Sequence, residues 1–139
     1  MKVDYRLLKA CALTYIAADG IHILDHMRQG RTLSAQVYAA GTFGIVAALI
    51  VLALVLREDR LAPLAAAAFG TIDAVAVFAV HFVPTWFFLS DSYVPLHLDG
   101  LSWISAALVV VAALALGGAG AAMLWTTAPL VPPNRNSVR

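Results

Sequence analysis

The run AQVYAAGTFGIVAALIVLALVL, residues 35–56, contains no charged residue and decides the fold class. A helix needs about 20 mostly apolar residues to cross the hydrocarbon core of a bilayer, and this run has that length. The composition of the whole chain also indicates a membrane protein, because 62% of its 139 residues are hydrophobic, against roughly 45–50% in soluble domains. The sequence therefore predicts an all-α integral membrane protein.

Three further apolar runs flank this segment, so a bundle of four transmembrane helices is expected. The predicted helices cover residues 5–26, 35–56, 61–88 and 101–125, within one domain over 1–127. The apolar pattern of the first run continues past Ala18, so we expect it to remain as a helix and not to be cleaved as a signal peptide. Residues 128–139 are polar and contain proline, which predicts a short flexible cytoplasmic tail.

The distribution of lysine and arginine predicts the orientation, because cytoplasmic flanks carry the excess of these residues. The two termini and the second loop contain seven of them: Lys2, Arg6, Lys9, Arg57, Arg60, Arg135 and Arg139. The first loop contains Arg28 and Arg31, and the third contains none. Both termini are therefore predicted to be cytoplasmic, in a multi-pass protein of a bacterial plasma (inner) membrane.

Composition also narrows the expected partners. The net charge of +1 is too small to indicate a nucleic-acid partner. The expected surroundings are the lipid bilayer, with a lipophilic small molecule as a further possible partner. Small residues at every fourth position let helices approach closely in membranes, either within the bundle or between copies in a homo-oligomer. Two such lines occur, Ala40, Gly44 and Ala48 in the second helix and Ala113, Gly117 and Ala121 in the fourth.

The stretch ADGIHILDHM, residues 18–27, is unusual for a membrane helix because it contains two acids and two histidines. Asp19, His22 and His26 fall within about 60° of one another on a helix, and Asp25 lies roughly 60° further round. The predicted topology places His22, Asp25 and His26 near the outer end of the first helix. These residues therefore form a candidate polar stripe that faces into the bundle.

Residues from other segments are predicted to reach the same end of the bundle. His81 lies in the outer half of the third helix, and His97 and Asp99 lie in the loop before the fourth. All four histidines of the chain are thus predicted on one side of the membrane. Asp73 lies deeper in the third helix, and an aspartate at a helix centre costs about 2.5–3.5 kcal/mol on insertion scales. Such residues are expected to face the bundle interior and to have a function.

The first functional interpretation is a transition-metal site. Imidazoles with a carboxylate suit Zn, Cu, Ni or Fe, and histidines four residues apart on a helix can reach one metal ion. The candidate ligands or orienting groups are His22, His26, His81, His97, Asp25 and Asp99. The run HILDH, residues 22–26, resembles the histidine–aspartate–histidine signature of nickel/cobalt permeases. The likeness is confined to residues 20–26, in which His22 lies closer to the Asp–His pair than in those proteins.

The second interpretation is a membrane-embedded acid–base enzyme of the isomerase or cyclase type. In this interpretation the candidate catalytic residues are Asp19, Asp73, His22 and His81. An aspartate would protonate an alkene or epoxide of a lipid-like or terpenoid substrate, and a histidine would take up the returning proton. Nearby aromatic residues would stabilise a carbocation, namely Trp86, Phe87 and Trp103.

Two other interpretations remain open from the sequence. His22 and His81 have similar predicted depths and would allow axial ligation of a haem. The short loops and small-residue faces would also suit an accessory subunit of a membrane complex.

Overall fold

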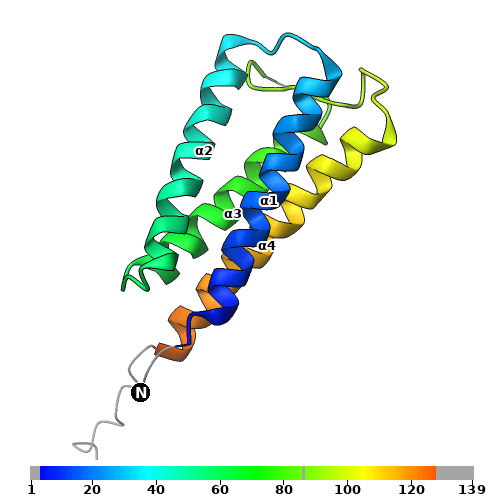
Figure 1. The fold of residues 1–139 in the computed structure, drawn as a ribbon. Helices are drawn as coiled ribbons and strands as arrows, with labels where there is room; N and C mark the ends of the chain where they lie inside the picture. Colours follow the sequence, from blue (N-terminus) through cyan, green and yellow to red (C-terminus); the bar gives the residue numbers. More distant parts are fainter. Residues whose placement is uncertain (1–3, 86, 128–139) are drawn as a thin grey trace, which may run out of the picture.

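The computed structural model describes residues 4–85 and 87–127 and folds them into a bundle of α-helices, with no β-strand among these residues (Figure 1). The helices are α1 (Arg6–Gln29), α2 (Ala35–Leu56), α3 (Ala62–His81) and α4 (Gly100–Thr127). Each of the four is long and apolar enough to cross a membrane. The all-helical, four-helix prediction is therefore confirmed. Trp86 and the predicted tail at 128–139 lie outside the described residues.

Local sequence signals account for the C-terminal end of α1 and the start of α2. Gly30 follows α1 with a positive φ of 62°, and its N–H donates to the carbonyl of Met27 at 3.2 Å. Glycine adopts this left-handed conformation without the steric penalty that a Cβ brings. Ser34 caps α2, because its hydroxyl accepts the N–H of Val37 at 3.2 Å. The turn between the two helices is therefore short and well defined.

Helix α3 ends at His81, well before the predicted end near Phe88. Pro84 explains the early end, because the ring of a proline disfavours helical conformation in the residue before it. The following segment turns back onto the helix instead of extending it. The N–H of Asp91 donates to the carbonyl of Val80 at 3.1 Å, and the N–H of Tyr93 donates to the carbonyl of His81 at 2.9 Å. These bonds satisfy carbonyl groups that the helix end leaves without partners.

Helix α4 packs most extensively against α3, and glycine allows their close approach. A Cβ built on Gly70 of α3 would lie 2.5 Å from the carbonyl oxygen of Ala113 and the nitrogen of Gly117 on α4. No side chain fits at that distance, so the two backbones are in direct contact at this point. Ala121, the third member of the predicted small-residue line in α4, is exposed. Two residues of that line thus pack against α3 within the chain.

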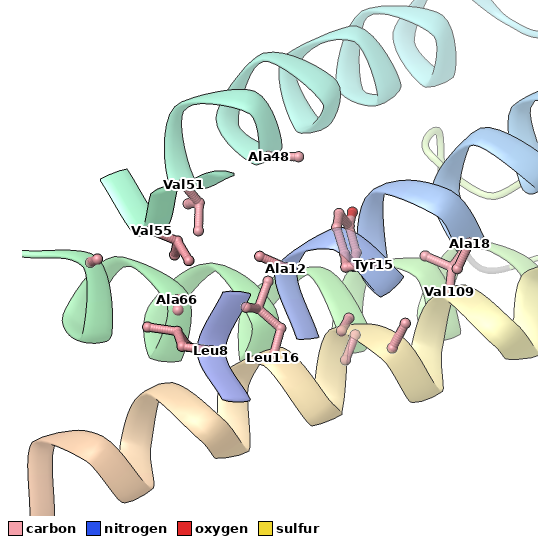
Figure 2. Close-up of a cluster of buried hydrophobic side chains, with 14 of the residues drawn as sticks. Leu8, Ala12, Tyr15, Ala18, Ala48, Val51, Val55, Ala66, Val109 and Leu116 are labelled. Carbon is pink, nitrogen blue, oxygen red and sulfur yellow. The ribbon is translucent and has the colours of Figure 1, made fainter. Parts of the chain in front are cut away.

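The buried core runs between α1, α3 and α4, with a smaller contribution from α2 (Figure 2). Leu8 and Leu116 are among its largest fully buried side chains. Helix α2 contributes three buried residues, Ala48, Val51 and Val55, all from its second half. The first half of α2 is largely exposed, and it is the half that begins beside the end of α1 (Figure 1).

The ion pairs between segments lie at the two ends of the bundle. At one end Lys9 of α1 pairs with Glu58 of the α2–α3 turn at 2.6 Å. At the other end Arg28 pairs with Asp99 at 2.9 Å, and Arg31 pairs with Asp91. Figure 1 shows the α1–α2 turn and the α3–α4 loop together at this second end, hereafter the histidine end. The shared location of the first and third loops agrees with the arrangement expected from the sequence.

Candidate metal centre

Three histidines from two helices converge at the histidine end. His22 and His26 lie one turn apart on α1, and His81 is the last residue of α3. Each offers a ring nitrogen within 4.8 Å of the others, which makes this the one group of three or more potential metal ligands in the described part of the chain. The Nε2 atoms of His22 and His81 are 3.2 Å apart. His22 and His81 are buried, whereas His26 is half-buried.

The outer ring nitrogens of the two buried histidines contact other elements. Nδ1 of His81 lies 3.2 Å from the carbonyl oxygen of Asp91. When Nδ1 carries the ring proton, it donates a hydrogen bond to this carbonyl. Nδ1 of His22 lies 3.3 Å from the hydroxyl of Ser105 on α4. The rings are thus held by their Nδ1 atoms while their Nε2 atoms face each other. A metal-binding histidine typically has its second nitrogen fixed in this way by a carbonyl, carboxylate or water.

Tyr93 closes the cluster from the α3–α4 loop. Its hydroxyl lies 3.5 Å from Nε2 of His26, and its ring centroid lies 4.5 Å from that of His81. The side chain is fully buried, and burial raises the pKa of its phenol above the ordinary value. Sequence reasoning did not identify Tyr93 as a residue of the site. Its contact with the histidines follows from the loop segment that turns back onto α3.

The two predicted carboxylates of the metal site bind arginine. The side chain of Asp25 is buried, pairs with Arg28 at 2.7 Å and accepts the amide of Gln29 at 2.7 Å. It approaches His22 only through the hydroxyl of Ser105, which lies 3.4 Å away. Asp25 therefore contacts the site indirectly, through Ser105, and does not belong to the group of three histidines.

Asp99 and His97 lie outside the convergent group. Asp99 is exposed, and its hydrogen bond to the Arg28 guanidinium lowers the pKa of this carboxyl group below the ordinary value. His97 is also exposed and has a positive φ of 48°. Of the six predicted metal-site residues, the structure thus brings three together, His22, His26 and His81, and places Asp25, Asp99 and His97 around them or in the loop.

Asp91 is a site residue that the sequence interpretation missed. Its carboxylate is 9% exposed and pairs with Arg31 through Oδ1 at 2.5 Å. The other oxygen, Oδ2, is buried, has no hydrogen-bond partner and lies 3.9 Å from Nδ1 of His81. A signal was present in the sequence, because Asp91 is an acid within the aromatic-rich segment that follows the third apolar run.

The predicted catalytic aspartates form a separate cluster deeper in the bundle. Tyr15 of α1 donates its hydroxyl hydrogen to Oδ2 of Asp73 on α3 at 2.8 Å. Asp19 and Asp73 are both half-buried, and a Cβ built on Gly44 of α2 would lie 4.0 Å from Oδ1 of Asp73. Within the described residues, no hydrogen bond connects either aspartate with His22. The four predicted catalytic residues are therefore divided between two polar clusters.

Comparison with other proteins leaves the site to be interpreted from its own geometry. The chain matches no protein-family model, no curated protein and no solved structure.

Proposed function

We propose that this chain is a multi-pass membrane protein that binds one transition-metal ion through His22, His26 and His81. The convergence of three imidazoles supports this function more than any other observation. Two nitrogens bound at 2.0–2.1 Å to a tetrahedral zinc ion are about 3.3–3.4 Å apart. The Nε2 atoms of His22 and His81 are 3.2 Å apart, close to that separation.

The chemistry of the donors also favours a cation at this point. In the tautomer in which both Nδ1 atoms donate, to Ser105 and to the Asp91 carbonyl, the Nε2 lone pairs of His22 and His81 face each other. A metal ion between them replaces the repulsion of two lone pairs with two coordinate bonds. Neutral imidazoles without thiolates suit Zn, Cu, Ni or Fe, and the site would use the ion for metal handling or for metal-dependent chemistry.

The proposed setting is the extracytoplasmic side of a bacterial plasma membrane, with both termini in the cytoplasm. The support is the distribution of basic residues, because Lys9, Arg57 and Arg60 lie at the end opposite the histidines. The first loop, with Arg28 and Arg31, carries fewer basic residues, and both of these are paired with acids.

Haem ligation by His22 and His81 fits this geometry poorly. An iron with two axial histidines holds them on opposite faces of the macrocycle. Their nitrogens are then separated by the iron and the ring plane, whereas these Nε2 atoms are only 3.2 Å apart. A single ion held by three histidines is the better assignment.

A second candidate function is acid–base catalysis on a lipid-like substrate by the deeper cluster. The observation that favours it is the hydrogen bond from Tyr15 to Asp73, with Asp19 one turn further along α1 from Tyr15. Gly44, in the largely exposed first half of α2, lies next to Asp73. A half-buried acid next to a phenol can pass a proton to an apolar substrate. In this alternative, Asp73→Asn would abolish turnover while the metal content stays unchanged.

Metal analysis of the full chain, purified in detergent, tests the metal-binding function. Elemental mass spectrometry would be performed on the protein as isolated and after addition and removal of excess Zn²⁺, Cu²⁺, Ni²⁺ or Fe²⁺. We expect about one ion per chain, lost in His22→Ala and in His81→Ala. His97→Ala is the matched control and should keep the ion, because His97 is an exposed histidine of the same end. A folded wild-type protein that takes up none of these ions would overturn the proposal.

A further inference from the structure

Asp91 has an unusual environment that the three-histidine site alone does not explain. Its side chain is buried, yet Oδ2 has no hydrogen-bond donor. A buried carboxylate oxygen without a donor is unfavourable, and buried polar groups are normally paired. The ring nitrogen Nδ1 of His81 is 3.9 Å away, too far for a hydrogen bond and near enough to form one after a small rotation.

We propose that Asp91 is the positioning residue of the metal site, an inference that rests on the proposed metal-binding function. With a metal on Nε2 of His81, the Nδ1–H of the same ring donates to Oδ2 of Asp91. Arg31 meanwhile holds Oδ1 of the carboxylate and fixes its direction. The result is a carboxylate–histidine–metal arrangement in which the carboxylate orients the ring and makes its nitrogen a stronger ligand.

Metal binding supplies the driving force for this change. In the structure, Nδ1 of His81 is directed to the Asp91 carbonyl at 3.2 Å. A metal ion withdraws electron density from the ring, so the Nδ1–H becomes a stronger donor and favours a charged acceptor over a neutral one. The charged oxygen of the same residue is the one that lacks a donor. One residue therefore offers His81 a neutral and a charged acceptor.

The neighbouring carboxylates do not have this property. Asp25 accepts hydrogen bonds from Arg28 and Gln29, so both of its oxygens are occupied. Asp99 is exposed and directed to Arg28. Asp99 is therefore a matched control for Asp91, because it is an arginine-paired aspartate of the same loop with no contact to a histidine.

The experiment measures zinc affinity and a cobalt spectrum for the full chain in detergent. We expect Asp91→Ala and Asp91→Asn to weaken Zn²⁺ binding by about 10- to 100-fold. Asp91→Glu, which keeps the charge, should recover part of the loss, and Asp99→Asn should bind as tightly as the wild type. The visible bands of bound Co²⁺ should shift in Asp91→Asn but not in Asp99→Asn, since only the former changes the orientation of a ligand.

The outcomes separate this role from a structural one and from the metal-binding function itself. Asp91 variants that unfold at a lower temperature but bind Zn²⁺ with wild-type affinity and spectrum would show a purely structural role and overturn the proposal. If Asp91→Ala does not fold, Asp91→Asn decides, because the amide nearly preserves the shape of the side chain. Wild-type protein that binds no metal overturns both proposals, whereas wild-type binding with no effect of Asp91→Asn overturns only this one.

Discussion

Tyr15 of α1 and Asp73 of α3 are joined by a 2.8 Å hydrogen bond in the middle of the bundle. Tyr15 is a buried core residue, and its ring packs edge-on against Phe69 of α3 at a centroid distance of 5.3 Å. The phenol therefore serves both the apolar core and a polar contact. A hydrogen bond contributes about 0.5–1.5 kcal/mol to stability, and about 1.5–3 kcal/mol when one partner is charged, so this contact matters for the association of the two helices.

The first prediction concerns this pair. We expect Tyr15→Phe and Asp73→Ala each to lower the free energy of unfolding in detergent, and the double variant to lose less than the sum. The coupling energy should lie within about 0.5–3 kcal/mol, as for other residues in direct contact. Tyr38→Phe is the control, since Tyr38 is 69% exposed and should have no effect. Additive losses in the double variant would show that the bond does not contribute to stability.

The second prediction concerns metal binding and stability. A ligand that binds only the folded state raises its stability, by about 2.7 kcal/mol when its free concentration is 100 times the Kd. Zn²⁺ at that concentration should therefore raise the unfolding temperature of the wild type, and a chelator should reverse the change. His81→Ala should give the same unfolding temperature with zinc and with chelator. A zinc effect of equal size in His81→Ala would mean that the ion binds elsewhere.

The third prediction concerns the contact between α3 and α4. Gly70→Ala places a methyl group 2.5 Å from backbone atoms of Ala113 and Gly117, so the helices have to separate. We expect a loss of at least about 1–3 kcal/mol, the usual cost of overpacking. Gly118→Ala is the matched control, because a Cβ there meets nothing within 4 Å. Unfolding in detergent measures both, and equal stabilities of the two variants would contradict the close approach.

The fourth prediction concerns alkaline pH. Burial raises the pKa of Tyr93 above the ordinary tyrosine value, so the folded state holds the phenolic proton more tightly than the unfolded state. The associated stability is constant below about pH 10 and declines as the pH rises beyond it, because the unfolded state then loses its proton first. Between pH 9 and pH 11, Tyr93→Phe should lose less stability than the wild type. Parallel losses would show that Tyr93 does not govern the alkaline limit.

The sequence predicted the helices well because their length and apolar content are local properties. The uncharged run at residues 35–56 coincides with α2, and its start is marked by the capping Ser34. The end of α3 was predicted too late, since Phe87 and Phe88 extend the apolar pattern past Pro84. Hydrophobicity alone does not distinguish a helix from an apolar loop that covers the end of a bundle.

The site was predictable to the extent that helical periodicity controls it. His22 and His26 lie one turn apart on α1, and the topology brings His81 to the same end, so their convergence follows from regular geometry. Asp91 and Tyr93 reach His81 through backbone bonds between a returning loop and the end of α3. No sequence period encodes such a return, which explains why these two contacts were missed.

The polar side chains of α1 have consequences for the order in which the chain assembles. Tyr15 finds its partner 58 residues later at Asp73, and His22 finds Ser105 83 residues later on the last helix. During synthesis the first helix would therefore enter the proposed bilayer before any of these partners exists. A nascent chain stopped after α2 therefore lacks the partners that Tyr15 and His22 of α1 have in the complete bundle. The polar side chains of α1 have all of these partners only after the final quarter of the chain has been made. In the proposed bilayer, truncation before α4 would leave His22 without the hydroxyl of Ser105.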